Sequence, residues 1–401
     1  MAASPYRVLL SSPRVRWQAL GGLLAQTTQG AGAIGIILVI RSHDRSLTLA
    51  GVVVGALSVA AGLARPLQGR FIDRHGARGL MAASGILHPS AYVAIVALAD
   101  SHASGGLLIA AGVLAGVTLA PVSACMRVAW GAADRTGDRT SAYSLVYLTQ
   151  ELSILAGPLL LAAVLTVANA SAALLTIAAV TCVGTLGFTA SLPSGPAANR
   201  AATVPIARGD RVLRARGMRA LIAATALVGG VIGGLQVGVP TFASAHGAPA
   251  ASGVLIALLS IGGIAGATIY GGRRWSRPPA GRLLALLAAL SVAMVLSVAA
   301  PSLAVLGVAL ALAGLPLNPS LTTISLLVDT HVSAASATEA FGWLSTGIAG
   351  GTGAASAIAG AVSHPSEPRP AFVVAAVAAV AAMLLVASVR RTLATPAAEP
   401  S

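Results

Sequence analysis

A single carboxylate, Glu151, lies deep inside a long apolar run of the sequence. It follows about nine residues of that run, which corresponds to roughly 14 Å along a helix. Because an apolar setting penalises the charged form of a carboxyl group, such a residue can bind and release a proton near physiological pH. A carboxylate that stays ionised and paired with an arginine such as Arg127 would instead hold two helices together. Two interpretations of Glu151 follow, proton coupling and a structural ion pair.

Neutral polar side chains occur in other apolar runs. Gln26 and Gln29 are one helical turn apart in the first of them, and Gln236 and Asn318 lie in two later ones. Together these groups suit a water-filled cavity that binds a polar or amphiphilic substrate, whereas each alone can equally form a hydrogen bond between helices. His88 can titrate near neutral pH and is a second candidate for proton coupling, with a structural histidine as the alternative.

No arrangement of residues in the sequence points to enzymatic chemistry. There is no HExxH motif, no pair of aspartates in an apolar run and no nucleotide-binding Walker A sequence. Cys125 and Cys182 each fall inside an apolar run, where a cysteine packs as a small apolar residue. The sequence therefore predicts no catalytic residue, metal site or cofactor, and a protein that is not an enzyme.

The elements that hold these residues are predicted to be membrane-spanning helices. Of the 401 residues, 56% are hydrophobic and only 9% are charged, far below the charged fraction of soluble domains. A spanning helix needs about 20 mainly apolar residues, and the chain has twelve runs of that kind. The runs are 17–40, 47–67, 79–99, 104–130, 142–167, 169–192, 218–243, 250–271, 281–300, 302–328, 338–363 and 370–389.

The arginines between the runs predict the orientation in the membrane. All 25 basic residues are arginines, and all but Arg41, Arg45 and Arg369 fall on one side if the segments alternate. Because cytoplasmic loops carry the arginine excess, we expect a multi-pass protein of the inner (plasma) membrane with both termini in the cytoplasm. The net charge of +14 does not indicate nucleic-acid binding, since no aromatic residues are interleaved with the arginines.

Weak internal similarity divides the chain into two halves. Leu114–Pro121 (LAGVTLAP) resembles Leu312–Pro319 (LAGLPLNP), and Gly157 is paired with Gly353 at a similar offset. We therefore predict an N-terminal six-helix half (1–192), a cytoplasmic linker (193–217) and a C-terminal six-helix half (218–401). Parallel repeats of this kind place a binding site near the membrane midplane between them.

One segment resembles the loop motif of the major facilitator superfamily, G-x-L-a-D-R-x-G-x-R. It runs from Gly69 to Arg78 (GRFIDRHGAR), directly after the second apolar run, with Phe71 in place of the leucine. The resemblance implies that this segment latches the two halves in an outward-facing state. Asp73 is expected to face the positive end of a neighbouring helix. The residues assigned to the latch are Gly69, Asp73, Arg74, Gly76 and Arg78.

Two further features bear on transport. The pair Gly157-Pro158 is similar to the helix-five motif of the family (GxxxGPxxGG), which is commoner in exporters, although Leu161 and Ala162 replace its last glycines. Arg127, Asp329 and Glu339 lie near inner helix ends, where they either close a cytoplasmic gate or serve as helix caps and interfacial charges.

These observations predict an all-α integral membrane protein with twelve transmembrane helices in two six-helix pseudo-repeats. The resemblance implies a secondary transporter that works by alternating access, as a monomer, on a small molecule. We favour proton-coupled efflux of a small amphiphilic compound. The alternatives are uptake of a small polar solute and, from another class, a membrane receptor or scaffold that transports nothing.

Overall fold

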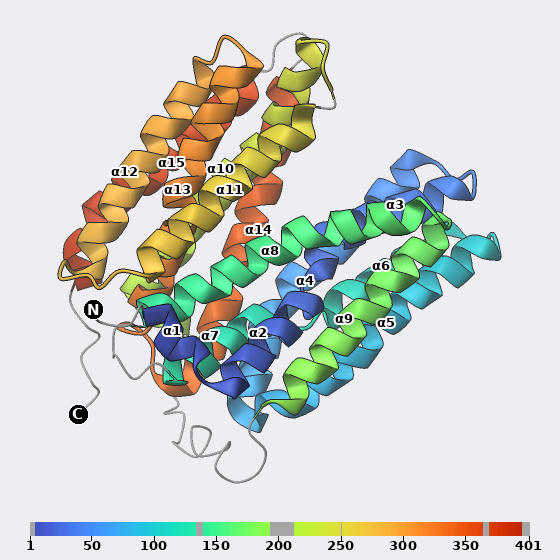
Figure 1. Cartoon of the computed structure of the whole chain (residues 1–401), viewed down its shortest axis with the longest axis horizontal. Helices are drawn as coiled ribbons and strands as arrows, with labels where there is room; N and C mark the ends of the chain where they lie inside the picture. Colours follow the sequence, from blue (N-terminus) through green and yellow to red (C-terminus); the bar gives the residue numbers. More distant parts are fainter. Residues whose placement is uncertain (1–4, 134–138, 193–211, 250, 364–368, 395–401) are drawn as a thin grey trace. The chain divides into compact units, whose positions relative to one another are not determined.

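The computed structural model describes residues 5–133, 139–192, 212–249, 251–363 and 369–394, and this part of the chain contains helices and no strand (Figure 1). The linker predicted at 193–217 lies largely outside the described residues. The helices of the first half are α1 (Pro5–Leu10), α2 (Pro13–Ala25), α3 (Thr27–Ser42), α4 (Leu47–His75), α5 (Ala77–Asp100), α6 (Gly105–Thr118), α7 (Val122–Ala133), α8 (Thr140–Leu165) and α9 (Ala170–Ala190). Those of the second half are α10 (Arg216–Ala245), α11 (Ala251–Gly271), α12 (Pro279–Val298), α13 (Leu303–Val328), α14 (Ala337–Val362) and α15 (Arg369–Ala394).

Each predicted apolar run coincides with one helix or with two consecutive helices. Within the described residues, eleven of these segments are long and apolar enough to cross a membrane. The remaining segment, α14, has 26 residues and matches the run predicted at 338–363. It is less apolar than the others because it contains Glu339 and several threonine, serine and glycine residues.

The chain divides into two compact units. The N-unit contains the described residues 8–133 and 149–192, and the C-unit contains 5–7, 139–148 and 212–394. Helix α8 is therefore divided, since its first nine residues, 140–148, belong to the C-unit and the rest belong to the N-unit.

Two spans are interrupted in ways that the hydropathy pattern does not predict. The first breaks at Gln26, between α2 and α3, and the fourth breaks between Thr118 and Val122. At the second break Pro121 has no N–H to donate to the carbonyl of Val117. Gln68 of α4 replaces that donor, because its Nε2 lies 2.8 Å from the Val117 oxygen and 3.2 Å from the Leu119 oxygen.

The segment from Gly69 to Arg78 is mostly helical, which corrects its prediction as a loop. Helix α4 continues to His75, and α5 begins at Ala77. Only Gly76 separates them, and its φ of 85° is a conformation that L-residues with a side chain rarely adopt. The chain therefore turns tightly at Gly76, because this residue has a positive φ.

Glycines bring helix backbones together in the same way in both halves. In the N-unit, a Cβ on Gly157 would lie 2.5 Å from the Thr27 oxygen, and a Cβ on Gly30 would lie 2.5 Å from the Ile154 oxygen. The C-unit repeats both contacts, since Gly351 packs against the Ala226 oxygen and Gly229 packs against the Ile348 oxygen.

These contacts correct one pairing of the internal repeat. The structural equivalent of Gly157 is Gly351, whereas a Cβ on Gly353 would meet nothing within 4 Å. The pairing of Leu114–Pro121 with Leu312–Pro319 is confirmed, because Gly116 packs against the Leu57 oxygen and Gly314 packs against the Leu259 oxygen.

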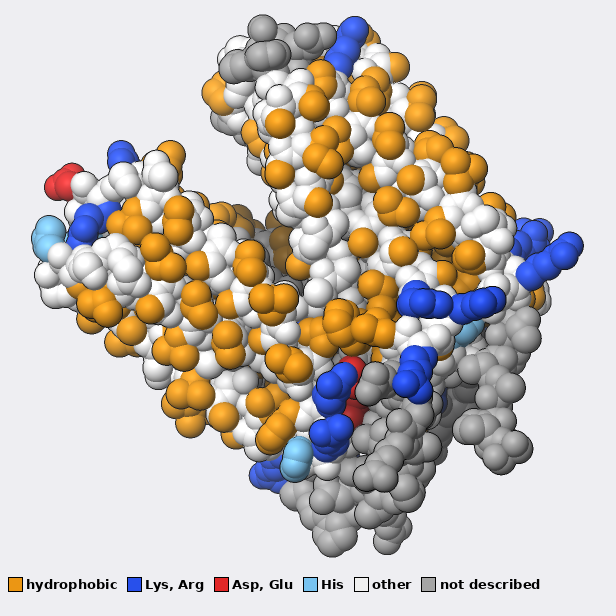
Figure 2. Space-filling view, turned by 180° about the vertical axis from the view of Figure 1, so that it is seen from behind, with side chains coloured by type: hydrophobic (Ala, Val, Ile, Leu, Met, Phe, Trp, Pro, Cys, Tyr) orange, Lys and Arg blue, Asp and Glu red, His pale blue; other side chains and the backbone are white. Residues whose placement is uncertain are grey.

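Apolar side chains fill the interior of each unit and also cover its surface. The core of the N-unit is built from α3, α4, α5, α6, α8 and α9, with Ile36, Ile40, Ile95, Leu108 and Ile177 fully buried. Large apolar residues such as Leu63, Ile269 and Val308 are more than 60% exposed. Figure 2 shows many hydrophobic side chains on the visible surface and the arginines gathered in a few places, as a helix bundle surrounded by lipid requires.

Candidate functional site

An ion pair joins the start of α8 to the end of α13 within the C-unit. The Nη1 atom of Arg139 lies 3.0 Å from Oδ2 of Asp329. The hydroxyl of Tyr143 donates to the same carboxylate, at 2.7 Å from Oδ2 and 2.9 Å from Oδ1. The ring of Phe341 in α14 packs edge-on against Tyr143, with 5.8 Å between the ring centroids. We call Arg139, Tyr143 and Asp329 the gate cluster.

Burial and charge act against each other in this cluster. Burial raises the pKa of Asp329 above its ordinary value, although the Tyr143 hydroxyl and Arg139 act in the opposite direction. Burial lowers the pKa of Arg139, but the charge of Asp329 and the hydrogen bond to it outweigh burial, so the net shift is upward. Asp329 therefore takes up a proton at a higher pH than an exposed aspartate does, and protonation removes the charge that holds Arg139.

Two further polar contacts continue along α8 and α13 in the direction away from the gate cluster. Ser144 Oγ lies 3.5 Å from Thr322 Oγ1, and the Tyr147 hydroxyl lies 3.2 Å from Ser325 Oγ. Hydroxyl pairs between spanning helices contribute about 0.6 kcal/mol each on average. The start of α8 is therefore tied to α13 by three layers of polar contacts.

Sequence reasoning identified only part of the gate cluster. It placed Asp329 at an inner helix end and used Arg139 only as a marker of orientation, and it did not consider Tyr143. The available signal was the spacing, because Arg139 and Tyr143 are four residues apart, which is the spacing of neighbours along a helix. The other two gate candidates, Arg127 in α7 and Glu339 in the first turn of α14, are both buried.

Glu151 lies near the middle of α8, in the part of the helix that belongs to the N-unit, and its side chain is half-buried. The next turn packs closely on the first span. Ser153 Oγ donates to the Leu23 oxygen at 2.9 Å, and Gly157 packs against Thr27 one turn further on. Pro158 follows directly and approaches Gly30, so both residues of the predicted helix-five motif contact α3.

The four neutral cavity candidates are distributed over both units. Gln26 is buried at the break between α2 and α3, where its Nε2 donates to the Gly22 oxygen at 3.0 Å. Gln29 is exposed and donates to Oε1 of Gln26 at 3.2 Å, so the structure brings these two together. In the C-unit, Gln236 is exposed on α10, and Asn318 is buried in α13.

His88 lies in a buried hydrogen-bond network of the N-unit. Its Nδ1 is 2.8 Å from the Ala115 oxygen, and its Nε2 is 3.3 Å from Thr28 Oγ1, which in turn lies 2.6 Å from the Tyr92 hydroxyl. Because a carbonyl oxygen only accepts, Nδ1 carries a proton, and Nε2 of the neutral ring accepts from Thr28. Each ring nitrogen therefore has a partner, as a structural histidine requires.

The predicted latch residues lie at the end of α4 and the start of α5. Gly69 is buried, Asp73 is half-buried, and Arg74 and Arg78 are exposed. Asp73 interacts electrostatically with Cys125, which lies in the first turn of α7. That Asp73 faces the positive end of a neighbouring helix stays a prediction.

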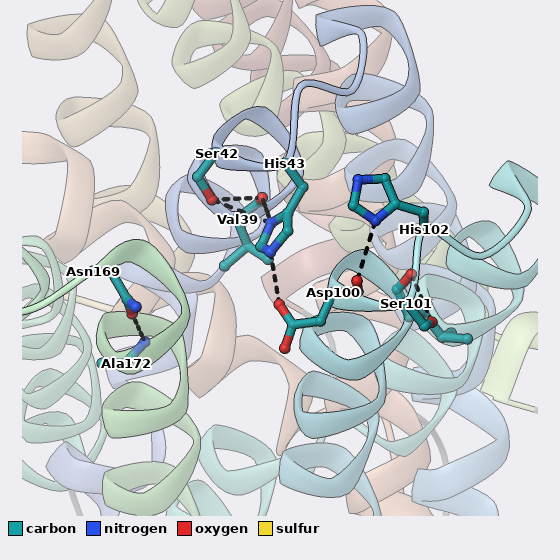
Figure 3. Close-up of polar contacts among 9 residues, drawn as sticks. Val39, Ser42, His43, Asp100, Ser101, His102, Asn169 and Ala172 are labelled. Carbon is teal, nitrogen blue, oxygen red and sulfur yellow. Dashed lines mark hydrogen bonds and ion pairs between the residues drawn. The ribbon is translucent and has the colours of Figure 1, made fainter.

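A second polar group lies at the C-terminal ends of α3 and α5 in the N-unit (Figure 3). There, Nε2 of His43 lies 2.6 Å from Oδ1 of Asp100, and Nδ1 of His43 lies 2.8 Å from the Val39 oxygen. His102 packs against His43 with 6.4 Å between the ring centroids. Because both partners of His43 are acceptors, only the doubly protonated ring donates to both.

We expect the His43–Asp100 pair to stabilise this end of the N-unit by less than about 1 kcal/mol, since the side chains are 20% and 56% exposed. A double-mutant cycle with His43→Gln and Asp100→Asn, followed by thermal unfolding, measures the coupling. We expect a coupling energy that is above zero and below this limit. A coupling energy of zero would show that the pair does not stabilise this end of the N-unit.

The described residues contain no group of three or more His, Cys, Asp and Glu side chains that could hold a metal ion.

A sequence model of the Major Facilitator Superfamily matches residues 19–348. The chain belongs to the Major Facilitator Superfamily. Membership makes it a multi-pass transporter of a small molecule and not an enzyme, and the superfamily fold accounts for the two sets of six spans. No curated protein matches the chain.

Solved structures of superfamily transporters share the fold at low sequence identity. A bacterial homologue of the iron transporter ferroportin, in the outward-facing state, has a TM-score of 0.76 and 15% identity, covering 93% of this chain and 98% of its own. The human organic anion transporter MFSD10 has a TM-score of 0.71 and 18% identity, covering 95% and 99%. FucP, in the outward conformation, has a TM-score of 0.69 and 14% identity, covering 95% and 99%.

Proposed function

We propose that this superfamily member exports a small amphiphilic compound in exchange for protons. The observation that carries the proposal is the placement of Glu151 in the middle of α8, the helix whose first turns form the gate cluster. A carboxylate at this depth in a spanning helix binds a proton readily, because lipid and protein disfavour its charge. The same helix therefore combines a titratable group with contacts that must break for the transporter to change state.

The proposed cycle alternates access to a cavity near the membrane midplane. The ends that carry the arginines face the cytoplasm, and the gate cluster closes the cavity on that side, with Arg127 and Glu339 as further gate residues. Gln26, Gln29, Gln236 and Asn318 line the cavity, and Asp73 with its neighbours forms the latch. Protonation of Glu151 from outside releases the substrate, and substrate binding from the cytoplasm displaces the proton.

Export is favoured over uptake by the packing of the helix-five motif. Gly157 and Pro158 contact the first span although the last two glycines of the motif are replaced. A related fold also serves proton symport, because one of the solved structures is the fucose:proton symporter of E. coli. Uptake of a small polar solute is therefore the alternative outcome of the test below.

The test is a flux measurement in proteoliposomes that carry a pH-sensitive dye inside. Ethidium, a small amphiphilic cation, and fucose, a polar neutral solute, are the two probes. Proton movement opposite to ethidium indicates exchange, whereas proton movement with fucose indicates symport. Proton movement with neither probe, together with a flat response to a wider panel of amphiphilic compounds and solutes, would favour the receptor or scaffold.

Removing the Tyr143 hydroxyl is expected to weaken the closed state of the gate cluster. Tyr143→Phe deletes the one hydroxyl donor that the two oxygens of the Asp329 carboxylate share. A hydrogen bond to a charged acceptor is worth about 2 kcal/mol, so the population with an open gate should rise roughly 30-fold. Alkylation of a cysteine placed at the buried position Thr322 reports this opening, in a background without Cys125 and Cys182.

Tyr92→Phe is the matched control. It removes a buried tyrosine hydroxyl bonded to Thr28 in the N-unit and leaves every residue of the gate cluster unchanged. Alkylation at position 322 should stay at the parental rate in this variant. If the two tyrosine variants react equally fast, the hydroxyl of Tyr143 does not hold the gate.

A further inference from the structure

The C-unit contains a buried cation that has no counterion among the described residues. Arg282, in the first turn of α12, is only 6% exposed. Its Nε and Nη1 atoms have no hydrogen-bond partner in the described structure. A buried charge is costly unless it is paired. The position of Arg282 at a helix N-terminus adds to this cost, because the helix dipole disfavours a cation there.

Two aromatic rings surround the guanidinium group and compensate only part of this cost. Its Cζ lies 5.6 Å from the ring centroid of Tyr270 and 5.7 Å from that of Trp275. Trp275 is fixed by its own Nε1, which donates to the Tyr270 oxygen at 2.9 Å. Cation–π contacts are worth about 2 kcal/mol at a desolvated site and leave the N–H groups without acceptors.

The loop between α11 and α12 adds further positive charge. Arg273 lies over the same Trp275 ring, with its Cζ 5.3 Å from the ring centroid. Arg274 and Arg277 are exposed in the same loop. The corresponding segment of the first half contains Asp73, whereas this loop has no acidic residue. Asp329, an acid of the same unit, is engaged by Arg139 and Tyr143.

We infer that Arg273, Trp275 and Arg282 form a binding site for the phosphate of an anionic lipid headgroup. An anion supplies the acceptors that the guanidinium of Arg282 lacks, and arginine binds phosphate through paired N–H groups. The source is a lipid because the loop joins two membrane-spanning helices and therefore lies at the bilayer surface. Trp275 suits the headgroup level, and Ile269, exposed two residues before the end of α11, faces the acyl chains.

The site does not depend on which substrate is transported, so it can be tested on the purified full-length protein without a transport assay. Binding is measured as the rise in the thermal unfolding midpoint on addition of ligand. The ligands are phosphatidylglycerol, phosphatidylcholine and inorganic phosphate. We expect phosphatidylglycerol to raise the midpoint most, phosphatidylcholine to raise it less, and inorganic phosphate to leave it unchanged.

Three variants assign the effect to the site. Arg282→Gln should weaken phosphatidylglycerol binding about tenfold, because the variant loses a charged group that donates hydrogen bonds to the phosphate. Arg273→Gln, at an exposed position, should weaken it roughly fivefold. Arg390→Gln removes an exposed arginine at the end of α15 and should bind like the parent.

Defined results would overturn the inference. Stabilisation by inorganic phosphate equal to that by phosphatidylglycerol would indicate a site for free anions. Full phosphatidylglycerol binding by Arg282→Gln, or equal loss in Arg390→Gln, would show that charge in general attracts the lipid. If Arg282→Gln does not fold, phosphatidylglycerol binding is measured in Arg282→Lys and Arg273→Gln instead. Lysine keeps the charge and loses the paired N–H groups, so both variants should bind the lipid more weakly than the parent. Unchanged binding in both would overturn the site.

Discussion

Glu151→Gln is expected to abolish transport driven by a proton gradient while the protein remains folded. Glutamine keeps the size and hydrogen bonding of the side chain but cannot titrate. Under the coupling hypothesis the variant still binds substrate and exchanges it across the membrane, because the gate cluster and the packing of α8 on the first span are intact. Flux driven by a pH difference should fall to the level of empty liposomes, whereas exchange of labelled substrate should persist.

Asp100→Asn is the control for this prediction. Asp100→Asn neutralises an acid that is 56% exposed at a helix end, and should leave gradient-driven flux unchanged. Full gradient-driven transport by Glu151→Gln would remove Glu151 from the coupling step. A variant that loses thermal stability along with exchange would support the structural ion pair instead.

Gly351→Ala is expected to destabilise the C-unit strongly, whereas Gly353→Ala is not. A Cβ at position 351 would overlap the Ala226 oxygen of α10, and a backbone oxygen cannot move aside without moving its helix. Overpacking of this kind costs about 1 to 3 kcal/mol, so the unfolding midpoint should fall by several degrees. At position 353 nothing lies within 4 Å, and alanine is the better helix former by about 1 kcal/mol.

The same comparison can be made in the N-unit. Gly157→Ala should behave like Gly351→Ala, since a Cβ there would lie 2.5 Å from the Thr27 oxygen. Gly187→Ala in α9 is the control, because its Cβ would meet nothing within 4 Å. Thermal unfolding of the four variants in one detergent tests the repeat itself. Tolerance of alanine at both 157 and 351 would show that these close contacts do not hold the helices together.

Hydropathy predicts the spans well because lipid imposes a length and a composition on every spanning helix. The run 302–328 differs by one residue from α13 (Leu303–Val328), and 250–271 differs by one from α11 (Ala251–Gly271). Hydropathy does not predict the helix breaks at Gln26 and Pro121, and at Pro121 the reason is physical. A side chain from another helix, Gln68, satisfies the carbonyl freed by Pro121, and such a donor is not visible in local sequence.

The candidate site was less predictable than the fold. Glu151 and His88 stand out in sequence because ionisable groups in apolar runs are rare, and their roles stay predictions. The Tyr143–Asp329 contact joins residues 186 positions apart, and the sequence around either residue does not indicate that the two are partners. Gly351 and Gly353 are two residues apart and therefore lie on different faces of α14, and only Gly351 packs against another helix. Glycine and alanine are so common in both halves that sequence alignment does not show which of the two corresponds to Gly157.

The division of α8 between the two units has a consequence for biosynthesis. Its first nine residues depend on Asp329 and Ser325, which lie 186 and 178 positions later in the chain. Ribosomes add about 5 to 20 residues per second, so these partners are made roughly 10 to 40 seconds after α8. During that interval the hydroxyls of Tyr143 and Tyr147 lack Asp329 and Ser325 as partners. The exposed start of α8 therefore marks an unfinished chain, which membrane proteases and chaperones can distinguish from the completed transporter.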